Sequence, residues 1–411
     1  MCSIYGGIGY NIAERVKEIG YRARDRGRDG GRCEQYRLRM QVGDDLMGYL
    51  GNHRATPTTE LEKGPLQPYD GMVHNGTIAN DVELGAWEGE IDSQVLSRVI
   101  ARTGPNDLAD SLARVKGSYA LACTNGATIL LACNYKPIWY YKDSEQNVFF
   151  SSLRRHLAPV LPWGQSPVQL PPYTTMDLRT KRTGVILRTS SKKVVVVCSG
   201  GLDSVTAAWK LKAEGYRVTL LHFQYGCKAE ARELALVRQL GGRLGASVVV
   251  LPLPSYALHG GGSLTDPGDN IVGGLAGAEY AHEWVPARNL VMTSLAIAYA
   301  EATGHHFVAL GNNLEESGAY PDNEEQMFLY LDQVADYAVQ NGYSCRVITP
   351  VGHLMKHEIV REGLALGVPY ELTWSCYRGG ARHCGDCGPC LMRKIAFQRN
   401  GATDPAQRVA G

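Results

Sequence analysis

The chain has 411 residues, which is more than a single hydrophobic core usually organises, so two domains are expected. Hydrophobic residues make up 44% and charged residues 20%, and the formal net charge of +1 provides no overall field for attracting nucleic acid or an anionic membrane. With no apolar run long enough to cross a bilayer and no signal-peptide pattern, the sequence predicts a cytoplasmic protein.

The first candidate site begins at Cys2. Removal of Met1 would leave an α-amino group beside the Cys2 thiol, and such an amine, with a pKa of about 7.7–8.0, can act as the base for the nucleophile. A cysteine at this position alone is weak evidence, but five motifs follow it in order. They are RGRDG (26–30), GNHRATPTTE (51–60), VHNG (73–76), DSQVL (92–96) and KGSYA (116–120).

These motifs resemble, in order and interval, those of class II (N-terminal nucleophile) glutamine amidotransferase domains. The resemblance implies that Cys2 attacks the glutamine amide and releases ammonia, while Asn75 and Gly76 supply the oxyanion-hole donors. It further implies that Arg54 pairs with the glutamine α-carboxylate and that Asp92 holds its α-ammonium group.

Each motif also has an ordinary explanation. Residues 26–30 could form a charged turn, in which Arg28 stands where proline is often found in this motif. Asn75 and Gly76 are a common hairpin-turn pair, and Asp92 could cap the helix that follows it. It is the ordered set over about 120 residues that favours the amidotransferase interpretation.

Short alternating segments continue to the middle of the chain. Residues 118–123, 128–133, 138–141 and 148–153 read as strands, and 173–189 holds two more short strands after a proline-rich stretch. We therefore expect an α+β domain over 1–189 and a second domain over 190–411.

The second domain is organised around residues 193–204. Four valines predict a buried strand, the SGGLDS string (199–204) forms a polar turn, and a helix is expected from Val205 to Gly215. The turn resembles the SGGxDS loop of the N-type ATP pyrophosphatases, whose backbone amides approach phosphate closely. The resemblance implies an ATP site made of Ser199, Gly200, Gly201, Asp203, Ser204 and, from a later motif, Lys356.

The segments after this loop alternate between strand and helix. Residues 217–226 and 246–253 predict strands, and 229–244 predicts a helix, so the order implies a doubly wound parallel sheet of the α/β class. Ligands of such sheets bind beyond the carboxyl ends of the strands. The glycine-rich segment 258–277 is either a lid over that site or a loop without function.

Three later motifs carry a second resemblance. VPARNL (285–290) opens a predicted helix, HFVALGNNLEESGAYPD (306–322) is a strand followed by a polar loop, and TPVGHLMK (349–356) ends in a lysine. They resemble motifs of the QueC family, which makes 7-cyano-7-deazaguanine from the carboxylic acid with ATP and ammonia. The resemblance implies substrate contacts from Arg288, Glu316 and Asp322, a phosphate contact from Lys356, and Mg²⁺ held by Asp203 with Glu316. Arg288 and Lys356 could also be ordinary surface charges.

Four of the eleven cysteines are bunched near the C-terminus. Their spacing suits a closed set of four thiolates around a structural zinc ion, although an iron–sulfur cluster would accept the same ligands. The set again resembles QueC, and it comprises Cys376, Cys384, Cys387 and Cys390.

Together the motifs resemble Gat-QueC fusions, in which an amidotransferase domain supplies ammonia to a QueC-like domain. The resemblance implies a small 7-deazaguanine base as acceptor and a formamidino or nitrile product. The sequence leaves open a homo-oligomer and an acceptor base within nucleic acid, although the near-neutral charge does not favour the latter. Rival interpretations are an asparagine synthetase-like enzyme and a non-catalytic nucleotide sensor.

Overall fold

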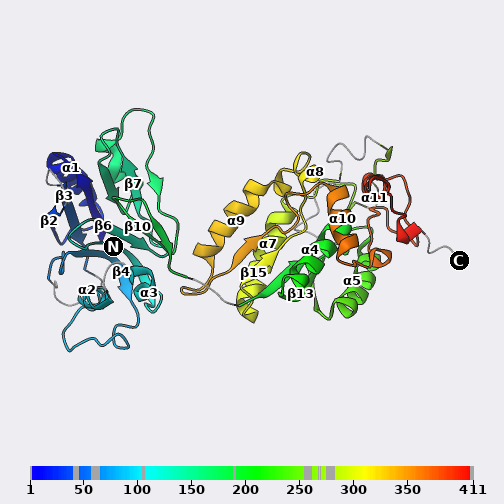
Figure 1. Ribbon diagram of the computed structural model, residues 1–411, viewed down its shortest axis with the longest axis horizontal. Helices are drawn as coiled ribbons and strands as arrows, with labels where there is room; N and C mark the ends of the chain where they lie inside the picture. Colours follow the sequence, from blue (N-terminus) through cyan, green and yellow to red (C-terminus); the bar gives the residue numbers. More distant parts are fainter. Residues whose placement is uncertain are drawn as a thin grey trace. The chain divides into compact units, whose positions relative to one another are not determined.

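The computed structural model divides into two compact units, which are described separately (Figure 1). The first is Met1–Arg188 with Gln340–Tyr343, and the second is Thr189–Val339 with Ser344–Gly411. The structure describes residues 2–39, 46–56, 65–103, 107–187, 191–253, 262–266, 268, 270–274 and 283–407.

The first unit contains two antiparallel sheets. One has the strand order β2-β3-β1-β8-β7-β9 and the other β11-β10-β6-β5-β4. The strands of the first sheet are β1 (Ser3–Gly9), β2 (Gly30–Leu38), β3 (Leu46–Arg54), β7 (Trp139–Lys142), β8 (Val148–Ser151) and β9 (Val168–Gln169). Those of the second are β4 (Met72–Ile78), β5 (Gly117–Thr124), β6 (Ile129–Cys133), β10 (Thr174–Asp177) and β11 (Thr183–Val185).

One hydrophobic core joins the two sheets. It contains Ile4 and Leu50 from the first sheet together with Val73 and Leu131 from the second, all fully buried. Successive side chains of a strand point to opposite faces of its sheet, and these four lie on the inner faces, which pack together as a sandwich. The helices of this unit are α1 (Ala13–Ala23), α2 (Asp92–Thr103), α3 (Leu108–Leu112) and the 3₁₀ segment η2 (Arg154–Val160). The expected α+β class is confirmed.

The second unit contains a five-stranded sheet in the order β14-β13-β12-β15-β16, with every pair parallel. Chain order reverses between β12 and β15, so this is the switch point of a doubly wound sheet. The strands are β12 (Lys193–Val197), β13 (Arg217–Gln224), β14 (Ser247–Pro252), β15 (Phe307–Ala309) and β16 (Arg346–Ile348).

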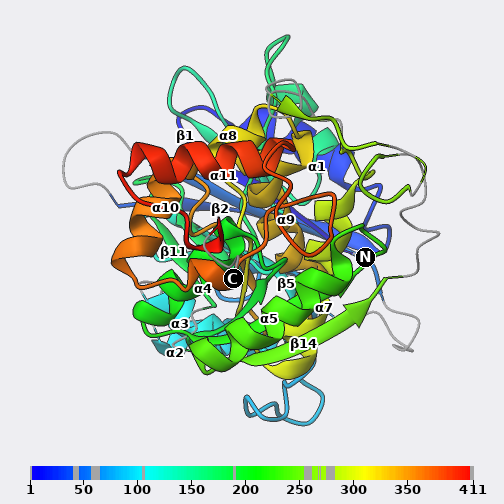
Figure 2. The same ribbon diagram turned by 90° about the vertical axis from the view of Figure 1, so that its right-hand side faces the viewer.

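Helices cover both faces of this sheet, as the α/β prediction requires. A single apolar cluster on one face joins α4, α5, α10 and α11 to Val194 and Val196, and Figure 2 shows α11 alongside α10. On the other face, α7 packs against β12 and β15. The helices are α4 (Leu202–Ala213), α5 (Glu230–Leu244), α7 (Arg288–Thr303), α8 (Leu314–Ser317), α9 (Glu325–Ala338), α10 (Lys356–Ala365) and α11 (Gly388–Arg399).

Two expectations need comment. Helix α4 begins at Leu202, three residues before the predicted start. The backbone is extended at Gly201, which is the N-cap, and the pattern of apolar residues used for the prediction does not reveal the first turn of a helix. Nine of the twenty residues of the proposed lid at 258–277 lie outside the described residues, so its role stays a prediction. No helix among the described ranges is long and apolar enough to span a membrane.

A buried ion pair fixes the C-terminal part of the second unit. The Arg393 guanidinium on α11 bonds both carboxylate oxygens of Asp404 at 2.8 Å, and the side chains are 2% and 5% exposed. Arg393 also donates to the Tyr370 carbonyl at 2.9 Å and the Thr373 hydroxyl at 2.7 Å. One side chain therefore ties α11 to two other segments of the chain.

We expect Arg393→Met to lower the free energy of unfolding by about 3–5 kcal/mol, because Asp404 would remain as an uncompensated buried charge. Chemical denaturation of the whole protein measures the change, and Lys394→Met, at the exposed neighbouring position, is the matched control. Equal stability of the two variants would contradict the prediction.

Candidate active sites

Cys2 lies beside the end of β3. Antiparallel pairing of Ser3 with His53 brings the residue before β1 against the residues that end β3. The Cys2 Sγ accepts a hydrogen bond from the Ala55 amide at 3.4 Å, directly after Arg54. Arg54 is buried and donates from Nη1 to the Pro65 carbonyl at 3.3 Å. Met1 lies outside the described residues, so its removal stays a prediction.

Asn52 brings the expected oxyanion-hole residues to the same place. Its buried side-chain amide donates to the Ser3 carbonyl at 3.2 Å and the His74 carbonyl at 3.3 Å, which joins the start of β1 to β4. Asn75 and Gly76 follow within β4, so the hairpin-turn alternative for this pair is wrong. A side chain at Gly76 would collide with the Ser118 carbonyl. Sequence reasoning missed Asn52, although it stands inside the GNHRAT string.

Tyr69 marks the region shared by the other glutamine-site residues. Burial raises the pKa of Tyr69, and the charges of Arg54, Asp92 and Cys2 also act on it, so the phenol lies within electrostatic range of all three side chains. Asp92 is the first residue of α2, and its Oδ2 accepts the Ile78 amide of β4 at 2.9 Å. The first unit therefore gathers Cys2, Arg54, Asn75, Gly76 and Asp92 around the ends of β1, β3 and β4.

In the second unit the SGGLDS loop joins β12 to α4. Gly200 has a φ of +84°, a left-handed conformation that favours glycine, and its carbonyl accepts the Trp374 amide at 2.9 Å. The Ser199 and Ser204 hydroxyls are 3.4 Å apart. The first intrahelical bond of α4 runs from the Val205 amide to the Gly201 carbonyl, so the amides before Val205 have no helical acceptor and form an anion site.

The segment after β15 closes on this loop at the switch point. Gly311 packs against the backbone of Ser204, where any larger side chain would collide. A cavity opens here, lined by Ser199, by the residues from Gly201 to Ser204, by the residues after β15, and by β13 and α7. Among the described residues, the Asn312 Oδ1 and the His222 Nε2 line it as buried atoms without a hydrogen-bond partner. Buried polar atoms that lack partners favour a polar ligand.

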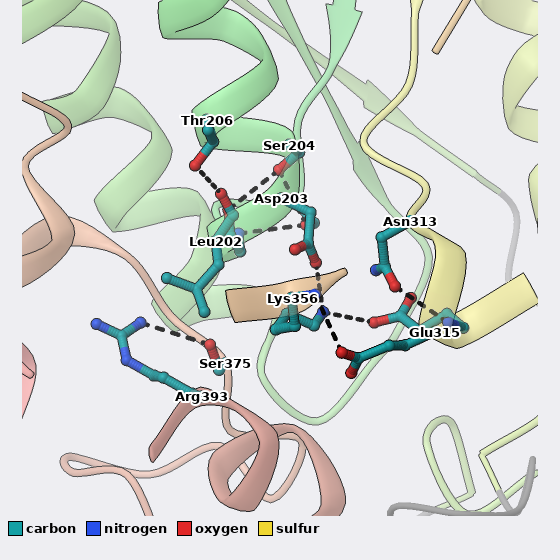
Figure 3. Close-up of polar contacts among 12 residues, drawn as sticks. Leu202, Asp203, Ser204, Thr206, Asn313, Glu315, Lys356, Ser375 and Arg393 are labelled. Atoms are coloured by element: carbon teal, nitrogen blue, oxygen red, sulfur yellow. Dashed lines mark hydrogen bonds and ion pairs between the residues drawn. The ribbon is translucent and has the colours of Figure 1, made fainter. Parts of the chain in front are cut away.

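Lys356 lies at the centre of this edge (Figure 3). Its Nζ is 2.6 Å from the Asp203 Oδ2 and 2.7 Å from the Glu316 Oε1, and its side chain is 8% exposed. The ion triad thus joins the first residue of α10 to α4 and α8. The interpretation of Lys356 as a surface charge is wrong, because the residue is buried.

Burial and mutual attraction compete in this triad. Burial raises the pKa of Asp203 to about 6 against the attraction of Lys356. Burial also acts to raise the pKa of Glu316, but Lys356 and Asn313 hold it below its ordinary value. Burial would lower the pKa of Lys356, yet the two carboxylates raise it, so the ammonium stays charged. The Asp203 Oδ1 is buried without a hydrogen-bond partner among the described residues, as an oxygen available to a cation would be.

The three expected substrate residues occupy different positions. Arg288 lines the cavity, and its guanidinium lies 5.9 Å over the Tyr225 ring. Its position at the start of α7 follows Ala287, whose φ of +50° is rare for a residue other than glycine. Glu316 lines the cavity within the triad, whereas Asp322 does not line it: the Asp322 Oδ2 accepts the Asn289 amide at 3.1 Å and caps α7.

The four C-terminal cysteines converge as expected. The Sγ atoms of Cys376, Cys384, Cys387 and Cys390 all lie within 4.8 Å of one another, which fits four ligands around one metal centre. Hydrogen bonds from Cys387 and Cys390 lower the pKa of Cys376, and the bond with Cys376 raises the pKa of Cys387 to about 12. Metal binding requires thiolates, so a cysteine whose pKa is lowered suits a role as a ligand.

Comparisons with known proteins cover the whole chain. The family model for the queuosine biosynthesis protein QueC matches residues 193–401. A 7-cyano-7-deazaguanine synthase of Saccharolobus solfataricus is 37% identical over 99% of both chains, and one of Sulfolobus acidocaldarius is 37% identical over 100% of both. A shorter protein of that name from Nitratiruptor sp. is 36% identical over 52% of this chain and 96% of its own length.

Solved structures give a weaker likeness. Glutamine phosphoribosylpyrophosphate amidotransferase from B. subtilis is 12% identical, with a TM-score of 0.36 over 99% of this chain and 100% of its own. An allosteric regulatory enzyme of purine biosynthesis is 13% identical, with a TM-score of 0.37 over 79% of this chain and 92% of its own. Because both TM-scores are below 0.5, the family assignment comes from the sequence relatives.

The cysteine cluster leads to a direct test. We expect Cys387→Ser to lower both bound metal and resistance to unfolding, because a closed thiolate site contributes its binding free energy to folding. Elemental analysis and thermal unfolding measure the two effects. Cys345→Ser, a buried cysteine outside the cluster, is the control for loss of a thiol and should keep its metal. Unchanged metal content in Cys387→Ser would contradict the assignment.

Proposed function

Because the chain belongs to the QueC family, we propose that it uses ATP and glutamine to convert a 7-carboxy-7-deazaguanine base into its nitrile or amidine derivative. The observation that carries this proposal is the full-length match to proteins named 7-cyano-7-deazaguanine synthase, which includes the amidotransferase-like first unit. The chain is an enzyme of this family, and the steps below are assigned to its own residues.

Ammonia is released in the first unit. The Cys2 thiolate attacks the side-chain amide of glutamine, and the C–N bond then breaks to release ammonia and leave a thioester on Cys2. Water hydrolyses the thioester to glutamate and free Cys2, and Asn75 and the Gly76 amide stabilise the oxyanion of each step. Arg54 and Asp92 hold the α-carboxylate and α-ammonium groups, so that free glutamine is chosen over other amides. The grouping of these five residues around Tyr69 and Asn52 supports this step.

Activation takes place in the second unit. The substrate carboxylate attacks the α-phosphorus of ATP and releases pyrophosphate, and ammonia then displaces AMP to give the amide. The first-turn amides of α4 and the Ser199 and Ser204 hydroxyls would bind the phosphates. Lys356 would neutralise the charge that develops on them. Mg²⁺, held by the free Asp203 oxygen, would supply further charge neutralisation.

A second activation determines the product. The amide oxygen attacks a second ATP, and loss of AMP and a proton from the resulting imidate yields the nitrile. Ammonia released within the same chain can instead add to the imidate and displace AMP, which yields a formamidine. We therefore propose formamidino-7-deazaguanine as the main product, with the nitrile as its competitor. The free base is the proposed acceptor.

Zinc is the proposed metal of the cysteine cluster. Four thiolates fill a tetrahedral coordination sphere and leave no position for water, so the ion would have a structural role. The two rival functions have less support, because an asparagine synthetase-like enzyme or a nucleotide sensor would not explain full-length similarity to deazaguanine synthases.

Cys2→Ala should abolish synthesis from glutamine and leave synthesis from added ammonium salts within about twofold of the wild type. The physical reason is that the nucleophile serves only ammonia release. Product formation with each nitrogen source measures both effects, and Cys33→Ala, an exposed cysteine of the first unit, is the control. Equal loss with glutamine and ammonium would contradict the two-site scheme.

The product is identified by mass spectrometry at saturating glutamine. We expect a species heavier than the nitrile by one ammonia, formed with release of pyrophosphate. Asp203→Asn should suppress every adenylation step while leaving glutamine hydrolysis intact, since it changes only the second unit. If the nitrile alone accumulates with every 7-deazaguanine tested, the amidine proposal is wrong and the protein is a nitrile synthase that supplies its own ammonia.

A further inference from the structure

A carboxylate that none of the sequence motifs identified also faces the cavity. Glu233 lies on the first turns of α5, is half-buried, and lines the same cavity as Asp203 and Lys356. Within the described ranges, the Glu233 Oε2 accepts a hydrogen bond from the Cys227 thiol at 3.7 Å. A thiol is a weak donor, so Glu233 keeps most of its capacity to accept hydrogen bonds from a ligand.

Other residues lining the cavity add positive charge and aromatic surface. Arg288 comes from α7, on the other face of the sheet, and lines the same cavity as Glu233, where its charge acts to lower the pKa of the Glu233 carboxyl. Tyr225 and Tyr377 also line the cavity, and the Arg288 Nη1 is 3.5 Å from the Tyr225 hydroxyl. A flat ligand with donors on one edge and an acceptor or carboxylate on another would satisfy both Glu233 and Arg288.

We infer that Glu233 recognises the guanine-type edge of the substrate by accepting hydrogen bonds from its ring N1–H and its exocyclic amine. This inference rests on the proposed function and assigns a specificity-determining residue to the same site. An ionised carboxylate only accepts, so it pairs with two adjacent N–H donors. The adenine edge presents a ring-nitrogen acceptor in place of one donor, and the carboxylate would repel it.

The electrostatics of Glu233 agree with this role. Burial raises the pKa of Glu233 to about 7, Glu230 on the same helix also raises it, and Cys227 and Arg288 act in the opposite direction. Two N–H donors stabilise the carboxylate form, so binding of the base lowers this pKa and releases a proton. Affinity for the base is therefore full above about pH 7 and falls by up to tenfold for each unit below it.

The test pairs one substitution with one change in the ligand. The substitution is Glu233→Gln, which keeps the side-chain shape, and the ligands are 7-carboxy-7-deazaguanine and its analogue without the 2-amino group. We expect Glu233→Gln to raise KM for the full base by about 30- to 100-fold, as for loss of a charged hydrogen-bond partner, and to leave ATP affinity unchanged. In the wild type, KM for the analogue without the 2-amino group should exceed KM for the full base by a similar factor. In Glu233→Gln the two KM values should differ by less than about threefold. Glu325→Gln, exposed on α9, is the control.

The inference would be overturned if the rise in KM for Glu233→Gln with the analogue equalled the product of the rises caused by the substitution alone and by the analogue alone. An unchanged KM for the full base in Glu233→Gln would also overturn it. Should this variant fail to fold, the wild type decides alone: KM for the full base should fall as pH rises toward 7, and less steeply for the analogue. Parallel pH profiles would count against Glu233. A wild-type protein inactive on every 7-deazaguanine overturns the proposed function itself, which is a distinct outcome.

Discussion

The buried ammonium of Lys356 between two carboxylates is the interaction on which the second unit's active edge depends. It draws α4, α8 and α10 together beyond the carboxyl ends of the parallel strands. Removing charges from water costs several kcal/mol per ion, and only close pairing offsets that cost. The three side chains are therefore held as a group, and the phosphate loop that begins α4 is held with them.

In the first unit the corresponding segments are positioned by an uncharged side chain. There a neutral amide, Asn52, bonds the carbonyls of Ser3 and His74 in two strands from different sheets, and the proposed site residues Cys2 and Asn75 are the chain neighbours of these two. A neutral link carries a smaller desolvation cost than an ion triad and adds no field at the nucleophile. The two proposed reaction sites are thus positioned by contacts of different polarity, a neutral amide in the first unit and an ion triad in the second.

Sequence reasoning reached both folds, the phosphate loop and the cysteine cluster, because each is encoded within a short stretch. The valine strand, the SGGLDS turn and the closely spaced cysteines carry their structure locally. It did not foresee the hydrogen bond from the first turn of α7 to Asp322, whose substrate role stays a prediction, and it missed Asn52 and Glu233. Their roles depend on which strands and helices pack together, and no local spacing records a contact between residues distant in sequence. The ion pairs of Lys356 with Asp203 and Glu316 could not be predicted for the same reason.

The Trp374 amide bonded to the Gly200 carbonyl fastens the chain just before Cys376 to the phosphate loop. Cys384 is exposed, and its Sγ lies 3.9 Å from that of Cys390, so an oxidant has access to a pair of sulfurs already close together. A disulfide there would remove two ligands at once and pull on the segment that holds the loop. Oxidation by air or peroxide would thus lower the activity at the nucleotide site without touching that site. The purified protein would keep this activity only in the presence of a reductant.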